Sequence, residues 1–255
     1  MSSLETYLRK LLGKTFLSKT TKFNKSLVND SDLIKKFNME KLNNVLFIGI
    51  NKNEIIKKYI EVGNFYYLEI FDPSSENNLS NNSISINNFI PSAEGMPSTL
   101  YSISNLDTNA TLFEKDLRWT DFNADKKFSL ETDNVFFKKI KDKKYDMLFL
   151  LLNGYELQYL KKNQDYLDLF KIVKFNYSKY NIDIKNFFKD YFMFFKKNNF
   201  IILYSKNNDF IEVKKYTDFL EGDYSKIYYC INKKYFTKIN HHSVSSYYLE
   251  NYFDR

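Results

Sequence analysis

A strand–helix–strand unit constrains the fold of this chain most strongly. Residues 45–50 read VLFIGI, a short apolar run with Gly49 near its end, which predicts a buried strand. A turn at 51–53 and apolar residues at helical spacing within 54–62 predict a helix after it. A second strand is predicted at 65–71, closed by Asp72-Pro73. Such units are right-handed and their strands are parallel.

The rest of the chain continues this alternation. The segment 146–152, which contains the longest apolar run, predicts a central strand, and a helix is predicted at 155–162. We also predict strands at 84–86, 100–103, 170–177, 200–204 and 224–231, a helix at 184–198, and a short helix or strand at 135–140. The pattern predicts an α/β fold with a mostly parallel central sheet and helices on both faces.

The length of 255 residues suits one large domain. We expect an N-terminal helical extension at 1–40, an α/β domain at 41–235 and a C-terminal tail at 236–255. The extension mixes apolar and basic residues, so it is either a helix packed on the domain or a partner, or an amphipathic helix at a membrane surface. Aromatic residues in the tail indicate packing on the domain or on a partner, so a homo- or hetero-oligomer is one hypothesis.

Net charge, cysteine content and the length of apolar runs argue against several classes of function. The net charge is +7, but the lysines are interleaved with Asn, Asp and Glu along the chain, so a nucleic-acid partner is not expected. With Cys230 as its one cysteine, the chain can form no internal disulfide, and we expect a cytoplasmic protein. No apolar run reaches the roughly 20 residues of a membrane helix. No metal site is expected, because the neighbouring His241 and His242 would face opposite sides of a strand.

Two predicted strand ends are candidates for ligand binding. Ligands of doubly wound sheets bind outside the carboxyl ends of the strands. Gly49 would let a ligand approach the backbone there. Asp72 could accept two hydrogen bonds from the vicinal hydroxyls of a ribose, although Asp-Pro is also a common turn. The pair suggests a nucleoside site.

Four segments in order resemble the FkbM-type S-adenosylmethionine-dependent O-methyltransferases. Residues 44–51 (NVLFIGIN) are similar to the first strand and cofactor loop of that family, and 68–73 (LEIFDP) to its second strand end. Residues 145–161 (YDMLFLLLNGYELQYLK) are similar to its most specific motif, and 135–140 occupies the place of a fourth segment. The resemblance extends over about 44–232 and implies a Rossmann-like methyltransferase fold.

The resemblance also implies a cofactor, a reaction and site residues. The cofactor would be S-adenosylmethionine, bound by Gly49, Asn51, Asp72 and Gly154. The acceptor would be a hydroxyl of a sugar, a glycan or another small molecule. Glu156 is the candidate catalytic base, with a carboxylate that stabilises a helix N-terminus as the alternative function.

Three acidic positions of the family pattern have no carboxylate in this chain. Phe47 and Leu151 stand at the ends of the first and central strands, and Asn176 stands near the end of the strand at 170–177. None of the three can act as a base or balance the charge of a sulfonium. The second hypothesis is therefore a catalytically inactive methyltransferase fold that serves as a binding or assembly module.

Overall fold

The computed structural model describes the sheet of the protein and the segments that pack against it. The described residues are 30, 33–34, 42–50, 57, 61, 65–73, 81–91, 97, 99–102, 112, 126–129, 132–133, 136–206, 209–222 and 226–236. Most of the expected N-terminal extension and nearly all of the expected tail, with His241 and His242, lie outside them. No helix among these residues is long and apolar enough to cross a membrane.

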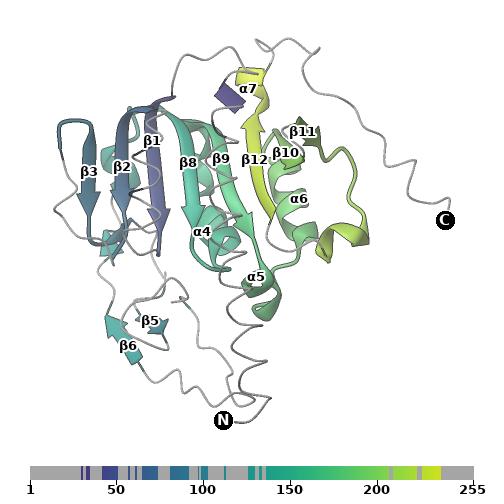
Figure 1. Cartoon of the computed structure of the whole chain (residues 1–255), viewed down its shortest axis with the longest axis horizontal. Coiled ribbons are helices and arrows are strands. Elements are labelled where there is room, and N and C mark those ends of the chain that lie inside the picture. The colour runs from purple at the N-terminus through teal and green to yellow at the C-terminus, as the bar shows by residue number, and fades with distance from the viewer. Residues whose placement is uncertain are drawn as a thin grey trace, which may run out of the picture.

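Within this part of the chain, eight strands form the main sheet (Figure 1). They are β1 (Leu42–Gly49), β2 (Phe65–Phe71), β3 (Ile84–Asn87), β8 (Tyr145–Leu151), β9 (Phe170–Tyr177), β10 (Phe200–Lys206), β11 (Asp209–Glu212) and β12 (Lys226–Asn232). Two small pairs accompany the sheet: β4 (Ile90–Pro91) with β7 (Thr132–Asp133), and β5 (Thr99–Ser102) with β6 (Lys126–Ser129). Figure 1 shows β5 and β6 beyond the carboxyl ends of β1, β2 and β8.

The strand order of the main sheet is β11-β10-β12-β9-β8-β1-β2-β3. The strands β3, β2, β1, β8 and β9 are parallel, and their order reverses between β1 and β8, as in doubly wound nucleotide-binding sheets. β12 is antiparallel to both β9 and β10 and lies between them. The expected Rossmann-like α/β fold with a mostly parallel central sheet is confirmed.

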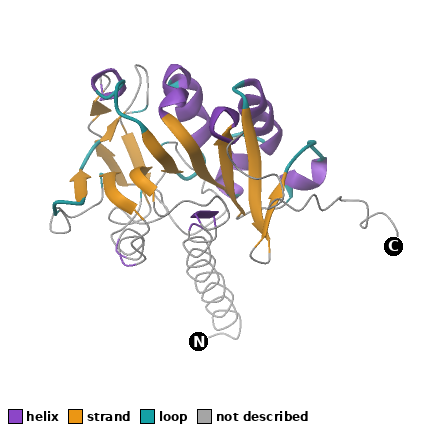
Figure 2. Ribbon diagram, turned by 90° about the horizontal axis from the view of Figure 1, so that it is seen from above, coloured by secondary structure: helices purple, strands orange, loops and turns teal. Residues whose placement is uncertain are grey.

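The described helices gather mainly on one face of the sheet, here called the α4/α6 face (Figure 2). They are α3 (Phe136–Lys139), α4 (Glu156–Lys162), α5 (Lys179–Asp183), α6 (Phe188–Lys197) and α7 (Lys233–Phe236), with 3-10 turns η2 (Gln164–Leu169) and η3 (Asp218–Glu221). Aromatic side chains fill the core of this face. The Phe175 ring stacks on Tyr191 of α6 at 4.6 Å between centroids, and Phe188 packs on Tyr228 at 4.5 Å. This is the amphipathic packing expected of α6, whose Phe188, Tyr191 and Phe195 are buried.

The opposite face buries a second apolar cluster and one ion pair. Leu33 and Ile34, which are helical, belong to this cluster. Lys174, in the middle of β9, has no exposed surface, and its Nζ donates to both carboxylate oxygens of Asp30 at 2.8 and 2.7 Å. Tyr229 of β12 donates to the same carboxylate at 2.7 Å, and the ring of Phe149 lies 4.3 Å from the Lys174 ammonium. Burial lowers the pKa of Lys174, and the charge of Asp30 opposes that shift.

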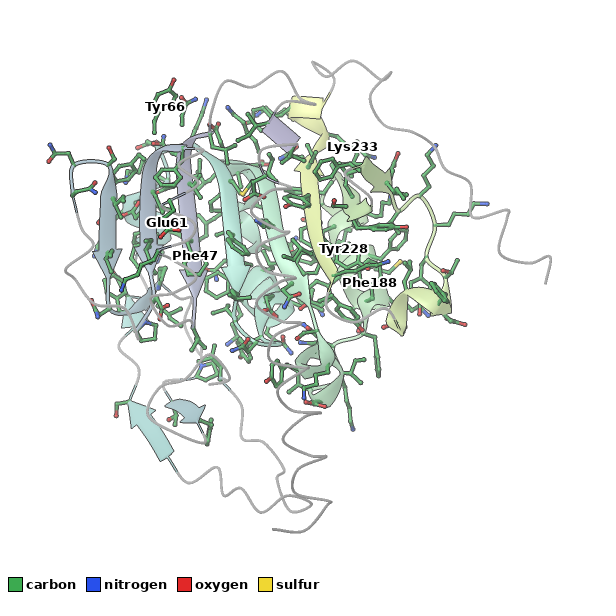
Figure 3. The ribbon with its side chains drawn as sticks, viewed as in Figure 1. Phe47, Glu61, Tyr66, Phe188, Tyr228 and Lys233 are labelled. Atoms are coloured by element: carbon green, nitrogen blue, oxygen red, sulfur yellow. The ribbon has the colours of Figure 1, made fainter. Side chains whose placement is uncertain are left out.

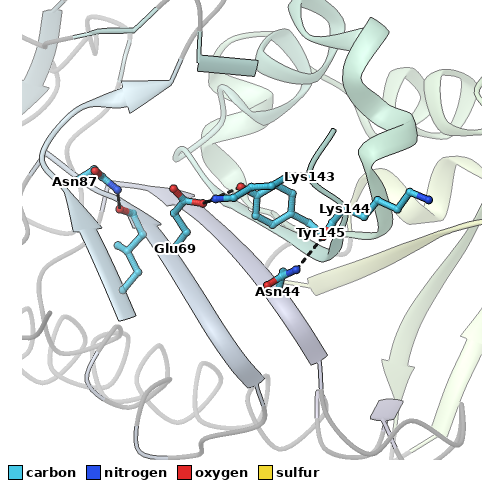
Figure 4. Close-up of polar contacts among 7 residues, drawn as sticks. Asn44, Glu69, Asn87, Lys143, Lys144 and Tyr145 are labelled. Atoms are coloured by element: carbon cyan, nitrogen blue, oxygen red, sulfur yellow. Dashed lines mark hydrogen bonds and ion pairs between the residues drawn. The ribbon is translucent and has the colours of Figure 1, made fainter. Parts of the chain in front are cut away.

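A polar cluster joins β2 to the beginning of β8 (Figure 4). Tyr145 Oη donates to Glu69 Oε2 at 2.7 Å, and Lys143 Nζ lies 3.1 Å from the same oxygen. The Asn44 amide donates to the carbonyl of Lys144 at 3.1 Å. These contacts connect the three strands near the beginning of β8, opposite the edge at which their carboxyl ends lie together.

Most predicted strands are confirmed, but one predicted helix is wrong in part. A single helix was expected at 184–198, whereas α6 begins at Phe188 and the separate helix α5 precedes it. Lys185 has a positive φ of 60°, which interrupts the helical backbone between the two. The segment at 135–140 is the short helix α3, and the predicted helix at 54–62 is described at 57 and 61, both helical.

Candidate functional site

The carboxyl ends of β1, β2 and β8 meet where the strand order reverses. Gly49 is the register partner of Leu151 in β8, and Ile48 is the partner of Phe71 in β2. Continuing that register by one residue sets Asp72 beside Gly49. Ile50 N donates to the carbonyl of Leu151 at 3.0 Å, which keeps β1 and β8 together past the last strand residue. The fold thus brings Gly49, Asp72 and the segment containing Gly154 to one edge.

Phe47 is tightly packed against Gly49. A Cβ atom on Gly49 would lie 2.6 Å from Cζ of the Phe47 ring and 3.3 Å from the carbonyl oxygen of Leu151. The Phe47 ring is nearly buried and meets the Phe149 ring edge-on at 5.2 Å (Figure 3). The glycine is therefore needed to accommodate an aromatic side chain of its own strand. That ring stands where the resemblance described above would place a carboxylate.

Asp72 has no exposed surface in the folded chain. Its backbone N–H donates to the carbonyl of Asn87 at 3.0 Å, which extends the pairing of β2 with β3 by one residue. Its neighbour Phe71 packs on Phe136 at 4.6 Å between ring centroids. The backbone at Asp72 is thus fixed as part of the sheet edge. Asn51, the fourth residue expected to bind the cofactor, lies outside the described residues.

The loop between β8 and α4 has an unusual backbone. Asn153 and Gly154 both have positive φ, at 50° and 107°. A Cβ on Gly154 would lie 2.7 Å from the carbonyl oxygen of Tyr180, so no other residue fits there without displacement. Leu152 is fully buried and Asn153 is 9% exposed. The loop is therefore a compact, defined structure at the candidate edge.

The carboxylate of Glu156 lies inside a group of hydrogen-bond donors. Leu152 N donates to Oε1 at 2.9 Å and Gly154 N donates to Oε2 at 3.0 Å. The Asn181 amide donates to Oε2 at 3.2 Å, and Tyr191 Oη lies 3.5 Å from it. Burial raises the pKa of Glu156 to about 7, and these hydrogen bonds partly offset the rise.

No sequence pattern points to Asn181 and Tyr191, which complete the surroundings of Glu156. They lie 25 and 35 residues further along the chain. The sequence predicts no element around Asn181, and it predicts Tyr191 only as part of the apolar face of the helix at 184–198. Asn176, the third of the missing acidic positions, pairs with Ile227 of β12 inside the sheet. Among the described residues, no group of His, Cys, Asp and Glu could hold a metal ion.

Comparisons with known proteins support no assignment by sequence. No family model matches the chain, and no curated protein matches it. Solved structures of three methyltransferases are similar. One, a putative caffeoyl-CoA O-methyltransferase from Staphylococcus aureus, has 13% identity and a TM-score of 0.42, covering 91% of this chain and 93% of that one. Another, the methyltransferase domain of bacterial CtHen1, has 10% identity and a TM-score of 0.42, covering 81% and 97%.

The third is the plantazolicin methyltransferase BpumL, solved with a substrate analogue and SAH. It has 11% identity and a TM-score of 0.41, covering 90% of this chain and 91% of that one. Identity and TM-score are low in all three, so the fold assignment rests on the strand order of the sheet itself.

Proposed function

We propose that this protein is a divergent S-adenosylmethionine-dependent O-methyltransferase of FkbM-like type. The observation that carries the proposal is the meeting of Gly49, Asp72 and the Gly154 loop at the point where the strand order reverses. Doubly wound sheets bind nucleoside-containing ligands at that point. The acceptor would be a hydroxyl of a sugar, a glycan or another small molecule. The pair β5–β6, beyond the same strand ends, lies on the side from which an acceptor would enter (Figure 1).

The residues fit the nucleoside part of the cofactor better than its charged end. Asp72 follows β2 directly, so its carboxylate can accept both hydroxyls of a ribose once the edge opens to admit the ligand. Gly49, Asn51 and Gly154 would supply backbone close to the ligand. At the other end, Phe47 and Leu151 offer apolar surface where a carboxylate would balance a sulfonium.

When bound, S-adenosylmethionine supplies an activated methyl group. The role of the protein's own residues is to align the acceptor and to accept its proton. Glu156 is the predicted base, with a pKa of about 7 that suits proton transfer near neutral pH. Glu156 is only 1% exposed. Its carboxylate is held by hydrogen-bond donors from its own loop, from α5 and from α6. These contacts favour the alternative function, in which Glu156 holds structure at the edge.

Calorimetric titration with S-adenosylmethionine tests the proposal. Wild-type protein should bind the cofactor, and Asp72→Asn should weaken binding about tenfold or more, because it removes a charged hydrogen-bond acceptor but keeps the side-chain shape. Glu61→Gln, a matched loss of one negative charge at an exposed helical position, should bind like the wild type. The absence of heat at millimolar cofactor, from protein shown to be folded, would overturn the proposal.

One observation favours a second candidate, an inactive fold that serves as a binding or assembly module. The Phe47 ring takes the space next to Gly49, and Leu151 is only 7% exposed beside it. Replacing Phe47 by Ala should then open the edge. Cofactor binding that appears only in this variant would support the module and would indicate a methyltransferase site closed by Phe47.

A further inference from the structure

The ends of β8 and β9 are interlocked by a buried polar network. Asn181, near the start of α5, accepts a hydrogen bond on Oδ1 from Ser178 N at 2.7 Å. Its amide nitrogen donates to Tyr191 Oη at 2.6 Å and to Glu156 Oε2 at 3.2 Å. Asn181 therefore links the beginning of α5 to α6 and to the β8–α4 loop at once.

A second link runs from the α5–α6 connection to the same loop. The Asn186 amide donates to the carbonyl of Gly154 at 2.9 Å, and its Oδ1 accepts from Gln158 Nε2 at 2.8 Å. The carbonyl of Gly154 is thus bound from outside the loop, while its N–H is bound by Glu156. Both polar groups of this left-handed residue are satisfied inside the protein.

The Glu156 carboxylate is the one charged group of this network. Other residues direct four donors toward it: the backbone N–H groups of Leu152 and Gly154, the Asn181 amide and the Tyr191 hydroxyl. A carboxylate accepts up to about four hydrogen bonds, and hydrogen bonds to charged groups are the strong ones. Among the described contacts, neither Leu152 N nor Gly154 N donates to a backbone carbonyl. Without the carboxylate, both N–H groups would therefore lose their hydrogen-bond partner.

We propose that Glu156 is a positioning residue rather than a proton-transfer residue: with Asn181, it latches the β8–α4 loop into the left-handed conformation that shapes the ligand edge. Its carboxylate is turned into the protein, toward α5 and α6. The latch makes the shape of the edge depend on α5 and α6. The consequence for ligand binding rests on the proposed function, whereas the latch itself does not.

Residue-resolved amide hydrogen exchange tests the latch directly. Glu156→Gln keeps the side-chain shape but turns one acceptor oxygen into an amide donor that faces other donors. One of the amides of Leu152 and Gly154 then faces a donor and the other keeps only a neutral acceptor, so exchange should rise at both, by about tenfold or more over wild type at the amide that loses its hydrogen bond. The amide of Leu148, within the same strand, should change less and serves as the internal reference. Unchanged protection of Leu152 and Gly154 would overturn the proposal.

Asn181→Ala provides a second, milder variant if Glu156→Gln fails to fold. It removes one donor to the carboxylate and leaves the carboxylate in place, so it should raise exchange at the same two amides by a smaller factor. Equal exchange in this variant and the wild type would count against Asn181 as part of the latch. The exposed change Glu61→Gln should leave both amides as protected as in the wild type.

Cofactor titration of the same variants separates the latch from the proposed function. If wild-type protein binds S-adenosylmethionine, a loosened loop should weaken affinity in Glu156→Gln, and Asn181→Ala should follow in the same direction. A base would behave differently: Glu156→Gln would keep wild-type affinity and lose turnover, and Asn181→Ala would affect neither strongly. If no protein binds the cofactor, the exchange result still decides on the latch.

Discussion

Replacing Lys174, the buried lysine of β9, should destabilise the protein more than any exposed charge change. Lys174→Met keeps the length of the side chain and leaves the Asp30 carboxylate buried without its ammonium partner. Breaking a buried ion pair from one side costs about 3–5 kcal/mol. Tyr229 still donates to Asp30 at 2.7 Å, so we expect a loss of about 3 kcal/mol, at the lower end of that range.

The same reasoning predicts that the double variant recovers most of the loss. Lys174→Met with Asp30→Leu removes both charges and adds apolar volume to a cluster already lined by Leu33 and Ile34. Buried pairs replaced by apolar residues are often neutral or stabilising. The remaining loss is the acceptor of the Tyr229 hydroxyl, about 1 kcal/mol. The double variant should therefore unfold within about 1 kcal/mol of wild type.

Urea titration followed by circular dichroism measures all these variants. Lys197→Met, an exposed lysine in the last turn of α6, is the control and should stay within about 0.5 kcal/mol. The reasoning is refuted if Lys174→Met loses less than about 1 kcal/mol, or if the double variant is as unstable as the sum of the two single variants.

Three further perturbations follow from the candidate edge. Gly154→Ala should lower the free energy of unfolding by about 2 kcal/mol or more, because φ is 107° and a Cβ would lie 2.7 Å from the Tyr180 carbonyl oxygen; thermal melts that match wild type would contradict this. Gly49→Ala should cost about 1–3 kcal/mol through the Phe47 ring, and much less in a Phe47→Ala background; additive losses in urea would speak against that contact. Folding raises the pKa of Glu156 from 4.5 to about 7. The stabilisation that comes from this shift is complete below pH 4.5, and about 3 kcal/mol of stability is lost as the pH rises through 7. Wild type should therefore lose stability over this range relative to Glu156→Gln, and parallel curves of stability against pH would show that the shift is absent.

The strands were the most predictable part of the fold. β2 and β9 have the boundaries predicted from their apolar runs, and β8 differs by one residue. Buried parallel strands are nearly continuous apolar runs, so they are visible in one sequence. The reversed direction of β12 was not predicted, because its apolar pattern does not depend on whether its neighbours are parallel. The interruption before α6 was missed for a similar reason: Lys185 carries no sequence signature of a left-handed residue.

At the candidate edge, only those residues could be predicted whose position follows from the order of the strands along the chain. The carboxyl ends of parallel strands meet at one edge, so the adjacency of Gly49 and Asp72 follows from two correctly placed strands. The surroundings of Glu156 do not follow, because Asn181 and Tyr191 approach it from elements whose packing no local pattern encodes. The pairing of Lys174 with Asp30, 144 residues apart, is equally invisible in the sequence.

The position of β12 between β9 and β10 has a consequence for synthesis. The chain completes β9 and β10 before it reaches β12, so both strands have an unpaired edge until residues 226–232 emerge from the ribosome and insert between them. Open strand edges are templates for pairing with other chains. A nascent or truncated chain that ends before residue 226 would expose two such edges at once. β12, the last strand among the described residues, therefore protects the incomplete sheet from aggregation, and this protein should depend more on chaperones before that strand is added than after it.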